Sequence, residues 1–417
     1  MKYRIYIDMN MLRWTYAVLL LLMVQSCLSG SYEGSSDDMY GDTELLQPVQ
    51  VFIGDPTGEI VKQGTSLKGT GPIDNMSQVL GKDIFVYAFN SDMFTSYDKT
   101  SEKDNINTLV DGSVDNSGTK AGKRARTRAG SVSLDWIDNK IDLNYHAGSM
   151  TQIPYEFYAY YLDDLQVDES DYTRTDDAVK IKVEIDGRRD LMSAKAEITE
   201  AQLELAGDNL DYAREYSFSY YTSILGIHPT FYFKHHLARL EFELVPGYVQ
   251  TGSKDVTVVS VKEYSKYKAD FVVAEKSHPS QLGLRFEDAY KPFTLTEKDG
   301  SAIAEDRYVV RTLSDSGETP TATKMGDCLL VAPQNEALIA LVRLRETRAD
   351  GVVLDSETEM KLTYAGQTNP MMFAAGNKYK VKLQVYGATN VTSVVTLEKW
   401  NEGGKLEVDT ENDKPEI

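Results

Sequence analysis

Two adjacent histidines could in principle bind a metal ion or transfer a proton. His235 and His236 stand at the start of an apolar run, and neighbouring residues of a strand point to opposite faces. The pair cannot easily share one metal ion, and neither has a second His or a Cys at ligand spacing. We therefore interpret both as core or hydrogen-bonded histidines.

A second set of candidate ligands consists of five carboxylates between residues 163 and 171. They could hold Ca²⁺, but they lack the spacing and the glycine of an EF-hand loop, so we interpret them as a solvated turn. Phosphate loops, nucleophile elbows, HExxH motifs and cysteine pairs are also missing. The sequence predicts no catalytic residue, no metal, no cofactor and no enzyme activity. The carboxylates are Asp163, Asp164, Asp168, Glu169 and Asp171.

Cys27 has the clearest chemical role. It follows an apolar run, Trp14 to Val24, which has basic residues before it and is shorter than the roughly 20 residues of a spanning helix. Val24-Gln25-Ser26-Cys27 resembles a bacterial lipobox. The resemblance implies a signal peptide over 1–26 and a lipid, such as palmitate, on the Cys27 thiol. The alternative is an ordinary signal peptide with an unrelated cysteine.

Composition limits the partners and the means of stabilisation. The chain has 417 residues and a formal net charge of −20, so it would be repelled by phosphate backbones and nucleic acid is excluded as a partner. There are two cysteines; if Cys27 carries a lipid, Cys328 has no intrachain partner. Ser, Gly and acidic residues dominate after Cys27, and we expect 27–47 to be a lipidated flexible tether.

Alternation of apolar and polar residues dominates the remaining chain. The clearest runs are Val179–Ile185, Ala238–Leu244 and Tyr379–Val385. A period of two with one polar side indicates strands that bury one face. Many short strands separated by turn residues predict an all-β fold of antiparallel sandwiches. Similar runs occur at 84–89, 155–161, 256–261, 329–331, 338–344 and 391–397.

Helix and loop signals are few. Thr199 and Gln202 form a capping-box pattern that Gly207 can end, which predicts one short helix. Polar stretches at 91–128 and 312–326 are expected to be loops. A drop in apolar density places a boundary near His228, which gives an N-terminal sandwich domain over 48–228 and a C-terminal one over 229–417.

Four stretches, in order along the chain, resemble the fimbrillins, the type V pilus subunits of Bacteroidetes. The start of the mature pilin is similar to 68–74 and 81–89, a mid-domain strand to 329–334, and the C-terminal strand pair to 376–400. The opening strand of the second fimbrillin domain has Phe, His, Ala, a basic residue and then alternating apolar residues. That pattern is filled by Phe233, His235, Ala238, Arg239, Leu240 and Phe242.

The resemblance implies two tandem transthyretin-like sandwiches and a particular route of assembly. A lipoprotein precursor reaches the cell outer membrane, where a trypsin-like protease removes its first strand. The C-terminal strand of another copy, or of a related pilin, then fills the groove and builds an extracellular fimbrium. The residues that would serve as the removable first strand are Val49, Val51 and Ile53, followed by the processing site at Lys68 and Gly69.

The remaining assignments concern the competing cut and the donor strand. Arg126 and Arg128, within the run 123–128, form an alternative processing site, and the simpler interpretation of that run is a solvated basic loop. Leu406 and Val408 alternate with Glu407, as an inserted strand should. The full set of donor residues that the resemblance implies is Leu397, Trp400, Leu406 and Val408.

The predicted function is therefore a structural subunit of a surface fimbrium that supports adhesion. One alternative is a tip or anchor subunit, because the acidic end at 409–417 is not ideal for insertion. A different alternative is a surface glycan-binding lipoprotein, which would need an exposed aromatic platform.

Overall fold

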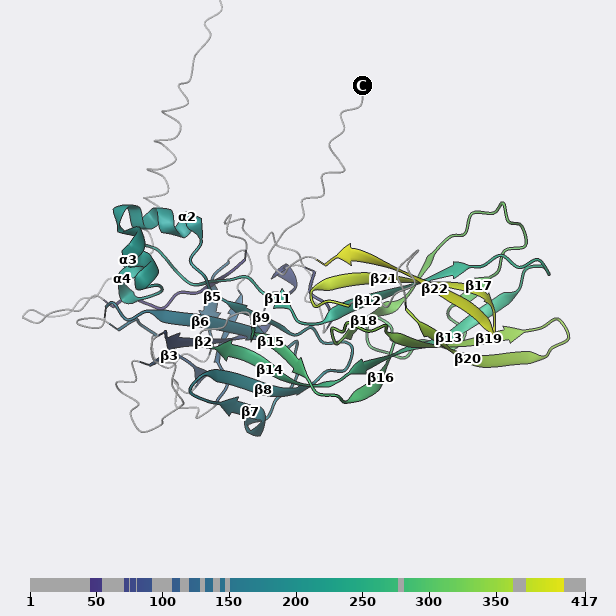
Figure 1. Cartoon of the computed structure of the whole chain (residues 1–417), viewed down its shortest axis with the longest axis horizontal. Coiled ribbons are helices and arrows are strands. Elements are labelled where there is room, and N and C mark those ends of the chain that lie inside the picture. Colours follow the sequence, from purple (N-terminus) through teal and green to yellow (C-terminus); the bar gives the residue numbers. More distant parts are fainter. Residues whose placement is uncertain are drawn as a thin grey trace, which may run out of the picture. The chain divides into compact units, whose positions relative to one another are not determined.

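The fold consists of sheets with a group of short helices between two of the strands (Figure 1). The computed structural model describes residues 46–54, 71–74, 76–79, 81–91, 107–112, 120–127, 132–137, 143–146, 151–276, 281–362 and 373–400. Within these ranges no helix is long and apolar enough to cross a membrane. Residues 45–417 make up one unit by their contacts, and the description below concerns that unit.

The described residues of the first half supply most of two sheets. Sheet A has the strand order β11-β9-β6-β2-β4-β5, with β3 added to β2, and sheet B has the order β15-β14-β8-β7. The strands of sheet A are β2 (Asp83–Asn90), β3 (Thr108–Val110), β4 (Lys123–Thr127), β5 (Leu134–Trp136), β6 (Tyr155–Tyr161), β9 (Met192–Lys195) and β11 (Lys234–His235). Those of sheet B are β7 (Tyr172–Arg174), β8 (Ala178–Glu184), β14 (Lys268–Glu275) and β15 (Gly283–Phe286).

The second half supplies sheets C and D. Sheet C has the order β18-β12-β21-β22, and sheet D has the order β16-β13-β19-β20, with β17 added to β13. Sheet C contains β12 (Ala238–Pro246), β18 (Thr323–Val331), β21 (Asn377–Gly387) and β22 (Asn390–Lys399). Sheet D contains β13 (Asp255–Lys266), β16 (Tyr290–Thr294), β17 (Val309–Arg311), β19 (Ile339–Thr347) and β20 (Val353–Lys361).

Pairing between the described strands is antiparallel, as predicted, with two exceptions. β12 and β21 run parallel in sheet C, and β1 (Phe52–Ile53) runs parallel to β10 (Thr230–Phe231). Parallel neighbours need a long connection between them, and the whole of sheet D separates β12 from β21 in the sequence. The all-β fold of sandwiches is confirmed.

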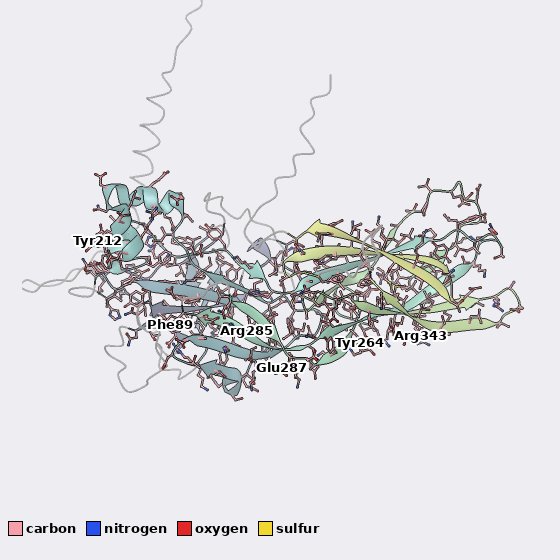
Figure 2. The ribbon with its side chains drawn as sticks, in the orientation of Figure 1. Phe89, Tyr212, Tyr264, Arg285, Glu287 and Arg343 are labelled. Carbon is pink, nitrogen blue, oxygen red and sulfur yellow. The ribbon has the colours of Figure 1, made fainter. Side chains whose placement is uncertain are left out.

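Sheet A has apolar side chains on both faces. In β2, Tyr87 and Phe89 belong to a core that continues through sheets B, C and D, and Figure 2 labels Phe89 in this region. The alternate residues Ile84, Val86 and Ala88 belong to a second core on the other face. β6 repeats this arrangement, so all but one of its residues are buried. A strand buried on both faces reads as a continuous apolar run, which explains the tyrosine-rich sequence of β6.

The helices differ in part from the prediction. α2 (Glu200–Leu203) begins at Thr199, and the Thr199 and Gln202 side chains each bond the other's main chain, so this capping box is confirmed. The helical stretch is longer than the sequence indicated, because α2 continues through a 3-10 turn (Glu204–Asn209) into α3 (Leu210–Glu215), and α4 (Tyr220–Ile224) follows. α4 has its own capping box from Ser219 and Thr222.

Both expected loops also contain strands. The stretch 91–128 includes β3 and β4, and 312–326 includes the start of β18. The solvated basic loop at 123–128 was wrong over the described residues, since Lys123 is buried and Ala125 lies in the second core. β4 lies between β2 and β5, so both of its edges are paired.

The boundary near His228 stays a prediction, and the sheet order adds a fact that bears on it. β14 and β15 follow that boundary in the sequence, but they complete sheet B beside β8 and β7. β11 belongs to sheet A and β12 to sheet C, so the chain changes sheet at His236 and Leu237. The buried side chains from Phe231 to His235 lie at odd positions, and the buried apolar side chains of β12 lie at even positions. The change of sheet explains why the alternation is interrupted there.

Candidate assembly site

Residues 47–54, called the first segment below, have main-chain partners on both sides. On one side β1 pairs with β10, and the Phe52 amide donates to the Pro229 carbonyl over 2.9 Å. On the other side the Val49 amide donates to Leu143 and the Leu134 amide donates to Val51, over 2.8 and 2.9 Å. The first segment therefore occupies a slot with 132–137 and 143–145 on one side and 229–231 on the other.

Side chains of the first segment fill the second core. Val49, Val51 and Ile53 are each exposed by 2% or less. Trp136 at the end of β5 adds a side-chain contact, since its indole nitrogen donates to the Val49 carbonyl over 2.9 Å. Main-chain bonding to both sides with alternate side chains in apolar pockets is the geometry of a strand inserted into a fold. These three residues are those predicted to form the removable strand.

Residues 71–74, called the strap below, are held by two buried carboxylates. The Gly71 amide donates to Asp163 Oδ2 over 2.7 Å, and the Ile73 amide donates to Asp190 Oδ2 over 2.9 Å. The Asp190 amide also donates to Asp163 Oδ2, over 2.9 Å. The strap thus depends on hydrogen bonds to specific side chains of neighbouring segments.

Asp163 corrects the interpretation of the acidic turn. Its side chain is buried, and burial raises the pKa of its carboxyl to about 6, although bonds from Gly71, Asp190 and the Tyr161 hydroxyl oppose the shift. Asp163 and Asp164 both have positive φ, 49° and 62°, a conformation uncommon outside glycine. The solvated-turn interpretation holds for Asp164, Asp168 and Glu169, which are exposed, and was wrong for Asp163.

His235 connects the strap to the C-terminal end of the described chain. It is buried, and its Nδ1 lies 2.9 Å from Asp190 Oδ2, which fits the core, hydrogen-bonded histidine that was predicted. The Trp400 ring stacks on its imidazole with centroids 3.9 Å apart and planes 15° apart. Trp400 is 2% exposed, and its indole nitrogen donates to the Ile73 carbonyl over 3.1 Å.

His236 faces a different environment from its neighbour. Its Nε2 lies 2.7 Å from the Ser193 hydroxyl, and its ring packs edge-on against Phe271 of β14. Burial lowers the pKa of His236 to about 4. Within the described ranges, no group of three or more His, Cys, Asp or Glu side chains is placed to hold a metal ion.

Several residues singled out from the sequence lie outside the described residues. These are Cys27, Lys68, Gly69, Arg128, Leu406 and Val408. Arg126 lies in β4 and pairs with Asp83. Leu397 lies in β22, opposite Tyr379 of β21, and is half exposed. Cys328 is buried.

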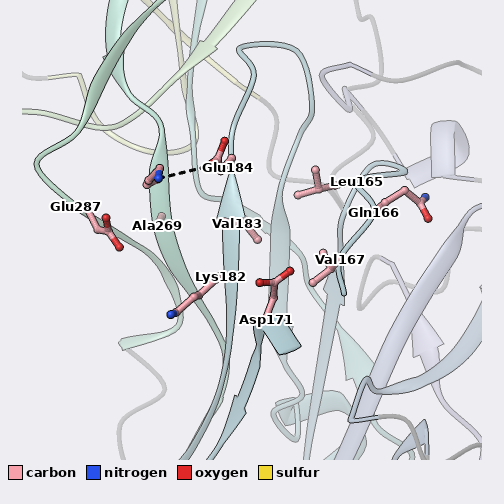
Figure 3. Close-up of a pocket in the computed structure, with 10 residues that line it drawn as sticks. Leu165, Gln166, Val167, Asp171, Lys182, Val183, Glu184, Ala269 and Glu287 are labelled. Atoms are coloured by element: carbon pink, nitrogen blue, oxygen red, sulfur yellow. Dashed lines mark ion pairs between the residues drawn. The ribbon is translucent and has the colours of Figure 1, made fainter. Parts of the chain in front are cut away.

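Figure 3 shows a hollow of about 460 Å³ on the strands of sheet B. Its lining carries both charge signs, including Lys182, Glu184 and Glu287, and Lys268 pairs with Glu184 over 3.5 Å. Opposite charges that neutralise one another across an open hollow do not define a ligand. The strap and the first segment therefore remain the stronger candidates for a functional site.

Sequence reasoning missed most of the network around the strap. Asp163 and Asp190 are single acidic residues in polar stretches, and only the fold brings them to Gly71 and Ile73. The available signal was Gly71-Pro72-Ile73, which is part of the stretch 68–74 that resembles the start of the mature pilin. Trp400 was singled out as a donor residue, but its partners inside the subunit were not foreseen.

Three comparisons relate the chain to known proteins. A family model described as fimbrillin-like matches residues 149–400. No curated protein matches.

Among solved structures, a "putative cell adhesion protein" from Bacteroides uniformis is 14% identical, with 85% of this chain and 100% of that chain covered and a TM-score of 0.43. The fimbrial anchor protein Mfa2 from Porphyromonas gingivalis is 10% identical, with 86% and 100% covered and a TM-score of 0.29. The tip fimbrial protein Mfa3 from the same organism is 9% identical, with 84% and 99% covered and a TM-score of 0.29.

Proposed function

The chain belongs to the fimbrillin-like family, and from that membership we propose that it is a structural subunit of a surface fimbrium, assembled by strand exchange after proteolysis. The precursor is a lipoprotein with its lipid on Cys27, held at the cell outer membrane. A trypsin-like protease releases the first segment, and the C-terminal strand of another subunit takes its place.

The observation that carries the proposal is the seating of the first segment. Its main chain bonds on both sides, and its buried side chains are aliphatic. Main-chain bonds do not depend on sequence, so any strand with apolar residues at alternate positions could replace it. The slot left behind would expose an unpaired edge and apolar surface, which favours refilling by another strand.

Lys68 is the cut site that fits this arrangement best. It lies between the first segment and the strap in the sequence, so a cut there separates the two without removing any strand of sheet A. A cut at Arg126 would fall inside β4, which has neighbours on both edges. A protease needs its substrate as an accessible extended chain, and paired strands resist it.

The donor segment is assigned to residues 401–417, called the tail below. Leu397 of β22 pairs with Tyr379 of β21, and Trp400 is buried in its own subunit, so neither is free to enter a neighbour. Leu406 and Val408 supply the alternating apolar residues that the slot would accept. Partners are then further copies of this chain or related pilins.

Limited trypsin digestion of the purified precursor tests the proposal. The expected products are a new N-terminus at Gly69 by sequencing and a ladder of oligomers that survives unheated SDS. Lys68→Gln should abolish the Gly69 start, and Lys62→Gln combined with Lys68→Gln should abolish the ladder as well, because trypsin could otherwise release the first segment at Lys62. Lys62→Gln alone, six residues before Lys68 in the same stretch, should leave both intact.

Two outcomes would contradict the proposal. One is a folded, Gly69-started subunit that stays monomeric at high concentration. The other is a chain found only in membranes, with a lipidated Cys27 and an intact first segment, which would make it an anchor subunit.

A further inference from the structure

The two segments on either side of Lys68 are held by different kinds of contact. The first segment is bonded through main chain on both sides, with the Trp136 indole as an added donor. The strap is bonded through Asp163, Asp190 and Trp400, all of which are buried. An incoming strand can reproduce the first set of contacts but not the second. The strap therefore stays in place when the first segment leaves.

Arg239 adds a further contact at the strap. Its guanidinium pairs with Asp74 at the end of the strap and with Glu241 on the same strand, β12. The guanidinium carbon lies 5.7 Å from the centroid of the Trp400 ring, within the range of a cation–π contact. Trp400 is thus enclosed by His235, Arg239 and the Ile73 carbonyl.

Trp400 stands at a position where the chain would otherwise be loose. β22 is the edge of sheet C, and among the described strands it pairs only with β21. The last residue of an edge strand tends to fray unless a side chain fixes it. Trp400 directly follows Lys399, the end of β22, so its anchoring fixes the point at which the tail begins.

We propose that Trp400 is a positioning residue for the donor role of the tail. Resting on the strap, it fixes the root of the tail in the cleaved subunit, so that the tail starts from a set place and direction. The inference rests on the proposed function and names a residue that acts in donating a strand but not in accepting one. A fixed root limits the conformations that the tail explores before it finds a slot.

A test must separate donating from accepting, because damage to the fold would impair both. Cleaved wild-type and Trp400→Ala chains are compared in two assays. Donation is the growth rate of the SDS-resistant ladder. Acceptance is the uptake of a labelled synthetic peptide of residues 401–417 by the emptied slot.

The expected result is a split between the assays. Trp400→Ala should take up the peptide at the wild-type rate but build ladders at least tenfold more slowly. Trp400→Phe retains stacking on His235 without the indole N–H and should give an intermediate rate. Thr392→Ala, at an exposed position of the same strand, serves as the control and should behave as wild type.

Two results would overturn the inference alone. One is a Trp400→Ala chain that builds ladders at the wild-type rate. The other is equal loss of ladder growth and peptide uptake, which would mean a general structural role. If the wild-type cleaved chain itself neither builds ladders nor takes up peptide, the proposed function fails and the inference fails with it.

Discussion

The indole nitrogen of Trp400 donates to the main-chain carbonyl of Ile73 over 3.1 Å, across 327 positions of sequence. Trp136 makes the matching bond to the Val49 carbonyl. The two acceptors lie on opposite sides of Lys68 in the sequence, one in the first segment and one in the strap. Apart from Trp14 in the predicted signal peptide, these are the only tryptophans of the chain.

Because Trp136 bonds the first segment and Trp400 bonds the strap, we expect cleavage to change the fluorescence of Trp136 and not that of Trp400. In a Trp400→Phe chain, loss of the first segment removes the partner of Trp136, so its emission should shift to longer wavelength as the indole becomes hydrated. In a Trp136→Phe chain, Trp400 emission should stay unchanged because the strap remains. A shift of Trp400 on cleavage would contradict the fixed strap.

Glu263 of β13 is predicted to destabilise the protein at neutral pH. Its side chain is fully buried, neither carboxylate oxygen makes a well-formed hydrogen bond among the described residues, and the Ile339 main chain only partly offsets the cost of burying the charge. Burial raises the pKa of Glu263 well above its usual 4.5. Stability from the protonated form is therefore fully present below about pH 4.5 and is lost as the pH rises through the folded-state pKa.

Glu263→Gln should accordingly raise the free energy of unfolding at pH 7 by about 1–3 kcal/mol, the usual cost of an unsatisfied buried polar group. The gain should shrink at pH 4, where the wild-type carboxyl is neutral. Urea denaturation at both pH values measures it. Glu359→Gln, at an exposed position of β20, is the matched control and should change stability by less than about 0.5 kcal/mol.

His236 should weaken the fold in acid. Its folded-state pKa is about 4 against an ordinary 6.5. The stability that the neutral imidazole gives the folded state is therefore fully present above about pH 6.5 and is lost as the pH falls toward 4. The full loss is about 3 kcal/mol. Asp163 has the opposite effect, because its pKa is raised to about 6. Its protonation stabilises the folded state as the pH falls from about 6 to 4.

The two effects can be separated by comparing variants over the same pH range. The difference in unfolding free energy between wild type and His236→Gln should fall as the pH drops from 7 to 4. A difference that stays flat over that range would show that His236 does not resist protonation.

Gly122 is predicted to be irreplaceable in sheet A. A Cβ there would lie 2.8 Å from the amide nitrogen and 2.9 Å from the carbonyl oxygen of Val86, so β4 would have to move away from β2. Gly122→Ala should cost about 1–3 kcal/mol, the usual range for overpacking. Gly317→Ala, whose Cβ would come no nearer than 3.4 Å to the Asp315 side chain, should be nearly neutral. Thermal melting of the two variants checks both.

The alternation of apolar and polar residues predicted the strands, because a strand that buries one face has apolar residues at every second position. Val179, Ile181 and Val183 follow that rule, and β8 is found where they predict it. β4 escaped notice because its outward residues are Arg124 and Arg126, whose charges resemble those of a loop. The partners of those arginines, such as Asp83 for Arg126, come from another strand.

Long-range relationships could not be predicted from the same pattern. Nothing near Trp400 in the sequence indicates that it stacks on His235, since the contact depends on sheet A and the end of β22 meeting. The same holds for β14, which was not among the predicted strands and whose sequence does not indicate that it joins β8. Asp163 was misjudged because it belongs to a run of acidic residues typical of a solvated turn, and only the fold shows that this member turns inward.

The continuity of β13 and β14 has a mechanical consequence. Only Tyr267 separates these strands, and the hydrogen bonds continue across the junction, from the Tyr267 amide to Ala289 and from the Glu287 amide to Lys268. A second pair of strands, β15 and β16, runs beside them in the same two sheets. Tension applied to one half would therefore pass into the other along two cross-linked main chains, and it would load those bonds in shear, the direction in which strands resist separation best.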